Sequence, residues 1–247
     1  FYERMECNGL KCVIFDIDDT MYAYTKYNEI GMERLEAYVT EHFSVSAGEF
    51  RKSYERMREE TEERLGVNNA AAHSRHIWIQ NLLETWDAPL FPHISEMYKS
   101  YWGTVLEVCR PEPGLLDCLT WLKERGIRIG VGSDMTTMMQ YEKLKRLGAA
   151  PFIDFIVTSQ EAGVEKPHAD FMKRCLFKAR ASASQCLFIG DNFVKDVGGA
   201  VSCGMYGVWY NPAKKRQPDG CRIKNGDYSE IRHFRELPDI VLSLARD

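Results

Sequence analysis

Residues 11–20 read Lys11-Cys12-Val13-Ile14-Phe15-Asp16-Ile17-Asp18-Asp19-Thr20, and this stretch decides the fold of the chain. Its apolar run from Cys12 to Phe15 predicts a buried strand, because the run is too short for a helix. Three carboxylates follow within four positions. Like charges packed this closely are unfavourable unless a cation or protons neutralise them. The stretch alone fits either a metal-assisted active site or an acidic turn, since Asp and Thr also favour turns.

The overall composition excludes several classes of protein. The 247 residues are 45% hydrophobic and 28% charged, enough for one large or two modest domains. The net charge of −4 gives no basic field for a nucleic-acid polymer or an anionic membrane. No apolar run approaches the length of a membrane span, and no signal segment is visible near the start. We therefore expect a cytoplasmic protein.

The cysteines and histidines form no metal-binding pattern. The eight cysteines are scattered without a C-x-x-C pair, so we expect free thiols rather than disulfides or metal ligands. They are Cys7, Cys12, Cys109, Cys118, Cys175, Cys186, Cys203 and Cys221. His73 and His76 are spaced three apart, but no third ligand is evident nearby, and we expect no metal there.

The segment from about residue 27 to residue 109 has helical periodicity. Ser46 with Glu49 forms a capping-box pattern for a second helix, and Gly66 ends it. The charges between residues 51 and 64 indicate a solvated helix face rather than a binding surface. Further helices are expected over 70–86 and from Pro92 onward. Four helices in succession predict an inserted helical bundle.

From residue 115 onward, helices and apolar strands alternate. Strands are expected at 127–131, 153–157, 186–189 and 206–209, and helices at 115–125, 136–147, 168–179 and 194–203. This alternation predicts a parallel sheet covered on both faces, with every strand's carboxyl end at one ligand-binding edge. The rest is rich in turns until a closing helix at 237–244. Lys214-Lys215-Arg216 indicates a solvated loop, with a position near an anionic substrate as the alternative.

Groups suited to one site follow the predicted strand ends. Ser133 and Asp134 follow the second strand, and Lys166 comes after the third. Asp191 follows the fourth, with Asp196 on the next helical turn. Each alone has an ordinary interpretation, such as a helix cap, a loop lysine or a turn. Because all of them come to the edge where the ligand should bind, we interpret the set as one site.

The set suits phosphoryl transfer. Asp16 and Asp191 can supply carboxylate ligands to Mg²⁺, which prefers oxygen and keeps several waters. Lys166 and the hydroxyl of Ser133 match the remaining charge and oxygens of a phosphoryl group. A carboxylate at Asp16 can attack phosphorus and form an aspartyl-phosphate. Asp18 can protonate the leaving oxygen and later deprotonate the attacking water.

With these residues in this order, the chain resembles the haloacid-dehalogenase-like (HAD-superfamily) hydrolases that have a helical cap inserted after the first motif. The matching motifs are Asp16-Ile17-Asp18-Asp19-Thr20, Ser133, Lys166-Pro167, and Gly190-Asp191 with Asp196. The resemblance implies an α/β fold: a Rossmann-like parallel-sheet core of residues 1–21 and 110–247, and a helical cap of residues 22–109.

The resemblance also implies the role of each motif residue. Asp16 is implied as nucleophile and magnesium ligand, and Asp18 as acid/base and ligand through its main-chain carbonyl. Ser133 and Lys166 are implied to bind the phosphoryl group, and Asp191 to bind the metal directly.

Supporting roles are expected for four further residues. Asp196 is implied to orient the metal-binding groups, and we expect Asn192 and Thr20 to support the same groups. Asp134 is expected among the substrate-binding residues, although its charge would repel phosphate unless it is paired or points away.

The implied function is a Mg²⁺-dependent phosphomonoesterase acting on a small phosphorylated metabolite, a nucleotide or a sugar phosphate. Family members that cleave carbon–halogen bonds lack the acid at the position of Asp18, so phosphate chemistry is favoured. The ending Val208-Trp209-Tyr210-Asn211-Pro212 is similar to pyrimidine 5′-nucleotidases. The alternatives are a phosphotransferase or phosphomutase, a 2-haloacid dehalogenase, or a catalytically silent binding protein. We expect a monomer or homodimer.

Substrate choice is expected to depend on the cap. Tyr22 and Tyr24 follow the first motif and are candidates to contact the leaving group. Trp78 and Trp102 are expected to pack in the core of the cap instead.

Overall fold

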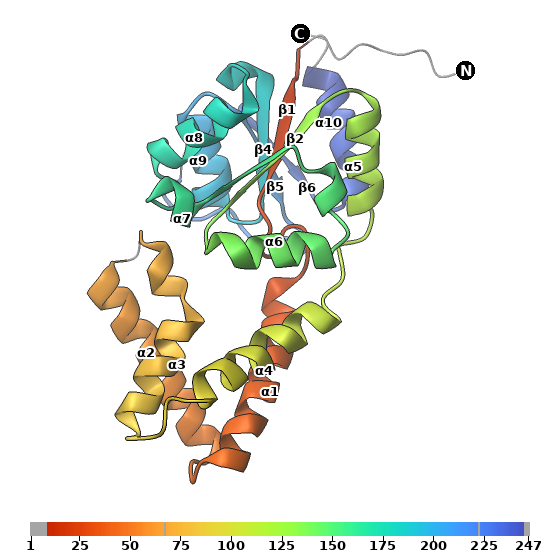
Figure 1. Ribbon diagram of the computed structural model, residues 1–247. Helices are drawn as coiled ribbons and strands as arrows, with labels where there is room; N and C mark the ends of the chain where they lie inside the picture. The colour runs from red at the N-terminus through yellow and green to blue at the C-terminus, as the bar shows by residue number, and fades with distance from the viewer. Residues whose placement is uncertain (1–8, 67, 222, 245–247) are drawn as a thin grey trace. The chain divides into compact units, whose positions relative to one another are not determined.

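The computed structural model describes residues 9–66, 68–221 and 223–244, and the chain divides into two compact units (Figure 1). One unit combines the residues up to Ala23 with those from Arg110 onward. The other is the continuous segment Tyr24–Cys109. Cys7, expected to be a free thiol, lies outside the described residues.

The first unit is built on a parallel sheet, as predicted. Within the described residues the sheet has six strands in the order β3-β2-β1-β4-β5-β6, and all pairs are parallel. The strands are β1 (Cys12–Phe15), β2 (Arg128–Ser133), β3 (Phe155–Thr158), β4 (Cys186–Gly190), β5 (Tyr206–Tyr210) and β6 (Tyr228–Ile231). The quoted stretch therefore supplies the central strand, buried along its whole length.

Helices cover both faces of this sheet. Figure 1 shows α8 and α9 on one side and α5 and α10 on the other. The helices of this unit are α5 (Leu115–Glu124), α6 (Thr137–Arg146), α7 (Ser159–Ala162), α8 (Ala169–Ala179), α9 (Gly199–Ser202) and α10 (Leu237–Leu244). Side chains of α8 and α9 pack against β1 and β4 in one buried cluster, which fixes the strands whose ends carry the acidic residues.

Some elements of this unit differ from the sequence-based expectation, among them the short helix α7, which was not predicted. The strand β6 was not predicted, because Tyr228–Ile231 is a short edge strand with polar residues and no apolar run. The helix expected over 194–203 is divided into a π-helical turn, Phe193–Gly198, followed by α9. The wide turn keeps Asp196 buried beside the end of β4.

The second unit is helical, as predicted. Its α-helices are α1 (Tyr24–His42), α2 (Ala47–Leu65), α3 (Arg75–Thr85) and α4 (His93–Val108). The capping box of Ser46 and Glu49 is present in both directions at the start of α2. Trp78 and Trp102 are buried, as expected for core residues. The expected third helix starts later than predicted, at Arg75, after a 3₁₀ turn.

The described cysteines are free thiols, as expected, and His76 packs against an aromatic ring. Every cysteine in the described part of the chain is free, and Cys12 lies opposite Cys186 in the register of β1 and β4. The ring of His76 stacks on Tyr98 with centroids 3.6 Å apart. Among the described helices, none is long and apolar enough to cross a membrane.

Candidate active site

The predicted site residues meet at the carboxyl ends of the central strands. Because β1 pairs with both β2 and β4, the residues that follow Phe15 adjoin those at the ends of the two neighbouring strands. The backbone N–H of Asp16 continues the ladder with a 2.9 Å hydrogen bond to the carbonyl of Ile189. This pairing brings Asp16, Asp191 and Asp196 together, with one carboxylate oxygen of each within 4.8 Å of the others.

A buried lysine joins two of these carboxylates. The Nζ of Lys166 lies 2.7 Å from Oδ1 of Asp16 and 2.7 Å from Oδ1 of Asp196. The Lys166 side chain is 3% exposed. Burial disfavours its charged form, but the charges of Asp16 and Asp196 outweigh burial and raise the pKa of Lys166 well above its ordinary value. The ammonium group therefore stays charged between the two carboxylates.

Asp196 reaches this lysine because residue 190 is a glycine. A Cβ at Gly190 would lie 2.2 Å from Oδ2 of Asp196, closer than any real contact. The same Oδ2 accepts a 2.9 Å hydrogen bond from the backbone N–H of Asn192. The side chain of Asn192 accepts from the N–H groups of Val194 and Lys195 and so caps the following turn. Both oxygens of Asp196 are thus engaged.

Asp191 sits beside the first motif and a basic loop. Its backbone N–H donates to Oγ1 of Thr20 at 3.0 Å, which ties the turn after β1 to the end of β4. Its Oδ2 pairs with Nζ of Lys215 at 3.3 Å. The sequence allowed either a solvated loop or a position near the substrate for residues 214–216, and this ion pair favours the second. Burial and the charge of Asp16 raise the pKa of Asp191 to about 6.

Asp16 is affected by burial in the same way. Burial, followed by the charges of Asp196 and Asp18, raises the pKa of Asp16 to about 7, although Lys166 opposes the shift. Oδ2 of Asp16 makes no hydrogen bond with the described residues. A carboxylate oxygen at the end of the central strand is therefore left for a ligand.

Asp18 is held by residues that the sequence analysis missed. Nζ of Lys143, fully buried, donates to both oxygens of Asp18 at 2.7 Å. The hydroxyl of Tyr22 donates to Oδ1 at 2.6 Å, and Gln140 donates to Oδ2 at 3.4 Å. Burial opposes the charged form, but Lys143 and Tyr22 outweigh it and lower the pKa of Asp18. Tyr22, a candidate substrate contact, is buried and bonded to Asp18 instead.

A signal for the missed residues exists in the sequence. Gln140 and Lys143 lie on α6 at the helical spacing of Met139, Leu144 and Leu147, which are buried. A lysine and an amide on an apolar helix stripe require polar partners in the interior, because an unpaired buried charge is strongly unfavourable. Asp18 supplies the partner of the lysine.

Ser133, the last residue of β2, and Asp134, which follows it, have different surroundings. Oγ of Ser133, 1% exposed, accepts a 2.8 Å hydrogen bond from Gln140. Oδ1 of Asp134 accepts from the backbone N–H of Lys166 at 3.0 Å, and its Oδ2 pairs with Lys195 at 3.0 Å. Asp134 is thus paired with a lysine. Because its charge is compensated, it does not repel a phosphate group.

The donor set fits a hard cation. Carboxylate oxygens are the ligands that Mg²⁺ prefers, and Asp16 and Asp191 each keep an oxygen that no described residue engages. Asp196 lies within the cluster but is committed to Lys166 and to the backbone. The residues present therefore suit a divalent cation held by Asp16 and Asp191.

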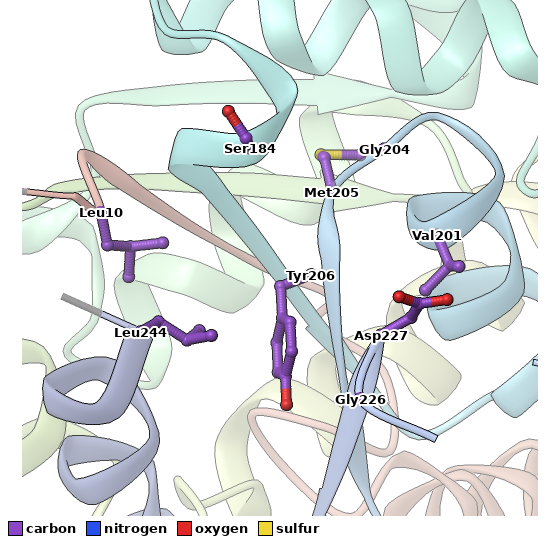
Figure 2. Close-up of a pocket in the computed structure, with 9 residues that line it drawn as sticks. All are labelled: Leu10, Ser184, Val201, Gly204, Met205, Tyr206, Gly226, Asp227 and Leu244. Atoms are coloured by element: carbon purple, nitrogen blue, oxygen red, sulfur yellow. The ribbon is translucent and has the colours of Figure 1, made fainter. Parts of the chain in front are cut away.

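A cavity elsewhere in this unit does not contain these residues. This cavity has a volume of about 320 Å³. It is bordered by Leu10, which precedes β1, and by Tyr206, the first residue of β5 (Figure 2). Both residues lie at the amino ends of their strands. The cavity is therefore at the edge of the sheet opposite to Asp16.

Fold and site together define a class of protein. It is an α/β enzyme whose parallel sheet brings carboxylates, a lysine and a serine to the ends of β1, β2 and β4. The chain belongs to the haloacid dehalogenase-like hydrolases, because the model of that family matches residues 10–204. The expected family membership is confirmed.

Similar proteins support the same assignment. A ribulose-1,5-bisphosphate 5-phosphatase of Halopiger xanaduensis is 30% identical over 93% of this chain and 98% of its own length. A glyceraldehyde 3-phosphate phosphatase of Methanocaldococcus jannaschii is 29% identical over 96% of this chain and 100% of its own. A pyrimidine 5′-nucleotidase of Escherichia coli is 23% identical over 84% of this chain and 89% of its own.

The solved structures agree on the fold. A 2-haloacid dehalogenase from Pseudomonas syringae matches with a TM-score of 0.73 and 23% identity, covering 95% of this chain and 98% of its own. Because these three relatives are phosphatases, the prediction of a hydrolase acting on phosphoric monoesters is confirmed.

Replacing Gly190 tests the packing that holds Asp196. We expect Gly190→Ala to destabilise the protein by about 1–3 kcal/mol, because the new methyl group overlaps the Asp196 carboxylate. The measurement is urea unfolding followed by circular dichroism. Gly103→Ala is the control: this exposed glycine of α4 has no atom near its missing Cβ, so alanine should stabilise by up to about 1 kcal/mol. A Gly190→Ala variant as stable as the wild type would contradict this account.

Proposed function

We propose that the chain is a Mg²⁺-dependent phosphomonoesterase that forms an aspartyl-phosphate on Asp16. One observation carries the proposal: Asp16 directly follows the central strand, with Oδ1 bonded to Lys166 and Oδ2 open to a ligand. A carboxylate fixed through one oxygen has its other oxygen oriented for attack, and fixed orientation is a large part of catalysis. The phosphatase relatives support the same chemistry.

The reaction proceeds in two steps on this chain's own residues. In the first, Oδ2 of Asp16 forms a bond to phosphorus and the ester bond breaks, while protonated Asp18 gives its proton to the leaving oxygen. In the second, ionised Asp18 takes a proton from water, the water oxygen bonds to phosphorus, and Asp16 is released with inorganic phosphate. The ammonium group of Lys143 favours the ionised form of Asp18. A phosphate dianion that binds nearby favours the protonated form of Asp18, because like charges repel.

The metal site is part of the proposal. Asp191 would hold Mg²⁺ through its unengaged carboxylate oxygen, and Asp18 would hold it through its main-chain carbonyl. Asp16 would hold it through Oδ1, which has a lone pair beyond the one that faces Lys166, so that Oδ2 stays free to attack phosphorus. The ion supplies positive charge that lets the phosphate dianion approach the acidic cluster. Asp196 has both oxygens engaged, so in this proposal it positions Lys166 and does not bind metal.

The phosphoryl group is bound by Lys166 and the Ser133 hydroxyl. Lys166 stays charged beside Asp16 and matches a phosphoryl oxygen. Both oxygens of Asp134 are engaged, so we assign it to positioning Lys166 rather than to direct substrate contact. Asn192 and Thr20 are proposed to fix the loop that carries Asp191.

The substrate is proposed to be a small phosphorylated metabolite, with a sugar phosphate favoured over a nucleotide. Two relatives at about 30% identity over nearly the whole chain are named for ribulose bisphosphate and glyceraldehyde phosphate, and a nucleotidase is similar at 23% identity. We further propose that residues 24–109 act as the cap that governs substrate choice. The free thiols suit a reducing compartment, which is why we keep the cytoplasm as the proposed location.

Removing the nucleophile tests the central role. We expect Asp16→Asn to lower phosphate release by at least about 10³-fold, because an amide neither attacks phosphorus nor carries charge for the metal. The measurement is phosphate release with Mg²⁺ from a panel of sugar phosphates. Asp239→Asn, at an exposed carboxylate on α10, is the matched control and should keep full activity. An active Asp16→Asn enzyme with native circular dichroism would refute the assignment.

Metal removal tests the proposed cofactor. We expect EDTA to abolish phosphate release and Mg²⁺ to restore it. Asp191→Asn should raise the Mg²⁺ concentration for half-maximal activity by about 10–100-fold, because a direct carboxylate ligand is lost. Asp219→Asn, in an exposed loop, should leave that concentration unchanged. Full activity after thorough metal removal would rule out the metal-dependent mechanism.

A double-mutant cycle tests whether Lys143 acts through Asp18. We expect Lys143→Met to lower kcat by about 10–100-fold in the wild type and to have little further effect in Asp18→Asn, because the two act as a unit. The exposed Lys145→Met on the same helix is the control. Additive losses from Lys143→Met and Asp18→Asn would mean that Lys143 does not position the acid/base group.

A further inference from the structure

The helical unit contains a buried arginine enclosed by aromatic rings. Arg75, the first residue of α3, is 7% exposed. Its guanidinium carbon lies 4.4 Å from the ring centre of Tyr101, 4.7 Å from that of Trp102 and 5.0 Å from that of Trp78. The faces of these rings attract the cation, but they leave the N–H groups at its edge without acceptors of their own.

Arg75 has no acidic partner among the described residues, and its Nη2 donates only to neutral groups, the Tyr24 hydroxyl and Oδ1 of Asn28. Arg58 on α2 shows the usual arrangement, with ion pairs to Glu55 and Glu62. A buried charge without a counter-charge is unfavourable. The position at a helix N-terminus adds to the cost, because that end of the helix already carries partial positive charge. Stability alone therefore gives no reason for an arginine here.

Three hydrogen bonds around Arg75 converge on one neutral acceptor. The hydroxyls of Tyr24 and Tyr101 and Nη2 of Arg75 all donate to one neutral oxygen, Oδ1 of Asn28. Nη2 of Arg75 also donates to the Tyr24 hydroxyl. Nε of Arg75 and the hydroxyl of Tyr54 are buried without a hydrogen-bond partner in the described structure. Native proteins rarely leave a buried N–H group unused, so Nε of Arg75 lacks an acceptor in the described structure.

We propose that Arg75, Tyr24, Tyr101 and Asn28 form a binding site for a small oxyanion, a phosphate or carboxylate group, within the helical unit. An oxyanion supplies both the missing negative charge and several acceptor oxygens, and arginine is suited to bind such groups. Tyr24 and Asn28 are only half-buried, so a ligand can reach the cluster from solvent.

The oxyanion has two sources. It is either a second anionic group on the substrate or a free anion in solution. The first source rests on the proposed phosphatase function, and the second does not. The experiment therefore has one arm that needs no catalysis and one arm that measures it.

The binding arm follows the side chain of Arg75 by NMR in the full-length protein. The Nε–Hε resonance of Arg75 is assigned by its loss in Arg75→Lys, and inorganic phosphate is titrated without Mg²⁺. We expect a saturable shift of this resonance. Tyr24→Phe keeps the aromatic ring and removes one donor, so it should weaken phosphate binding by about tenfold.

Two control variants belong to the binding arm. Arg58→Lys changes an arginine of the same unit that has carboxylate partners, and it should leave the Arg75 titration unchanged. Ser133→Ala alters the proposed phosphoryl site and should leave it unchanged as well. The proposal is overturned if the resonance does not shift, if Tyr24→Phe binds phosphate as the wild type does, or if Ser133→Ala abolishes the shift.

The kinetic arm compares a sugar bisphosphate with the matching monophosphate in the presence of Mg²⁺. If the anion belongs to the substrate, Tyr24→Phe raises KM for the bisphosphate by about tenfold and leaves KM for the monophosphate unchanged. If the NMR shift is present and both KM values are unchanged, the ligand is a free anion. If the wild type hydrolyses neither ester, the proposed function fails, while the NMR titration still decides the anion site.

Discussion

The structure depends on one buried interaction, the lysine that joins two carboxylates at the end of the central strand. Lys166 compensates charge that burial would otherwise make very unfavourable for Asp16 and Asp196. The pairing needs β1 between β2 and β4, and it needs a glycine at position 190 so that Asp196 can fold back over the strand end. The parallel sheet and the π-helical turn Phe193–Gly198 before α9 thus determine the geometry of a few polar atoms.

Much of the fold and of the candidate site was predictable from the sequence, for a physical reason. Short apolar runs alternating with amphipathic helices leave few options other than a parallel sheet, and parallel strands end at one edge. Polar residues directly after those runs, such as Asp16, Ser133 and Asp191, therefore had to gather there. The strand β6 escaped prediction because an edge strand with polar residues gives no apolar run.

The polar residues missed by the sequence analysis share a feature: they lie on buried helix faces. Lys143 on α6 and Arg75 on α3 occupy positions where the helical pattern calls for apolar side chains. A prediction from helical periodicity therefore assigns these two positions to the apolar core. Their partners differ, since Lys143 has the carboxylate of Asp18 and Arg75 has only neutral groups in the described structure. A buried cation requires a negatively charged partner. That partner is in the chain for Lys143, and in our proposal a ligand supplies it for Arg75.

The central claim is that Asp16 becomes phosphorylated during turnover. The most direct measurement is to stop the reaction with borohydride during hydrolysis of a sugar phosphate and to analyse peptides by mass spectrometry. Borohydride reduces an aspartyl-phosphate to homoserine and leaves free carboxylates unchanged. The account predicts homoserine at position 16, dependent on substrate and Mg²⁺, and none at Asp18 or Asp191. Active enzyme that yields unmodified Asp16, or homoserine at another aspartate, would contradict it.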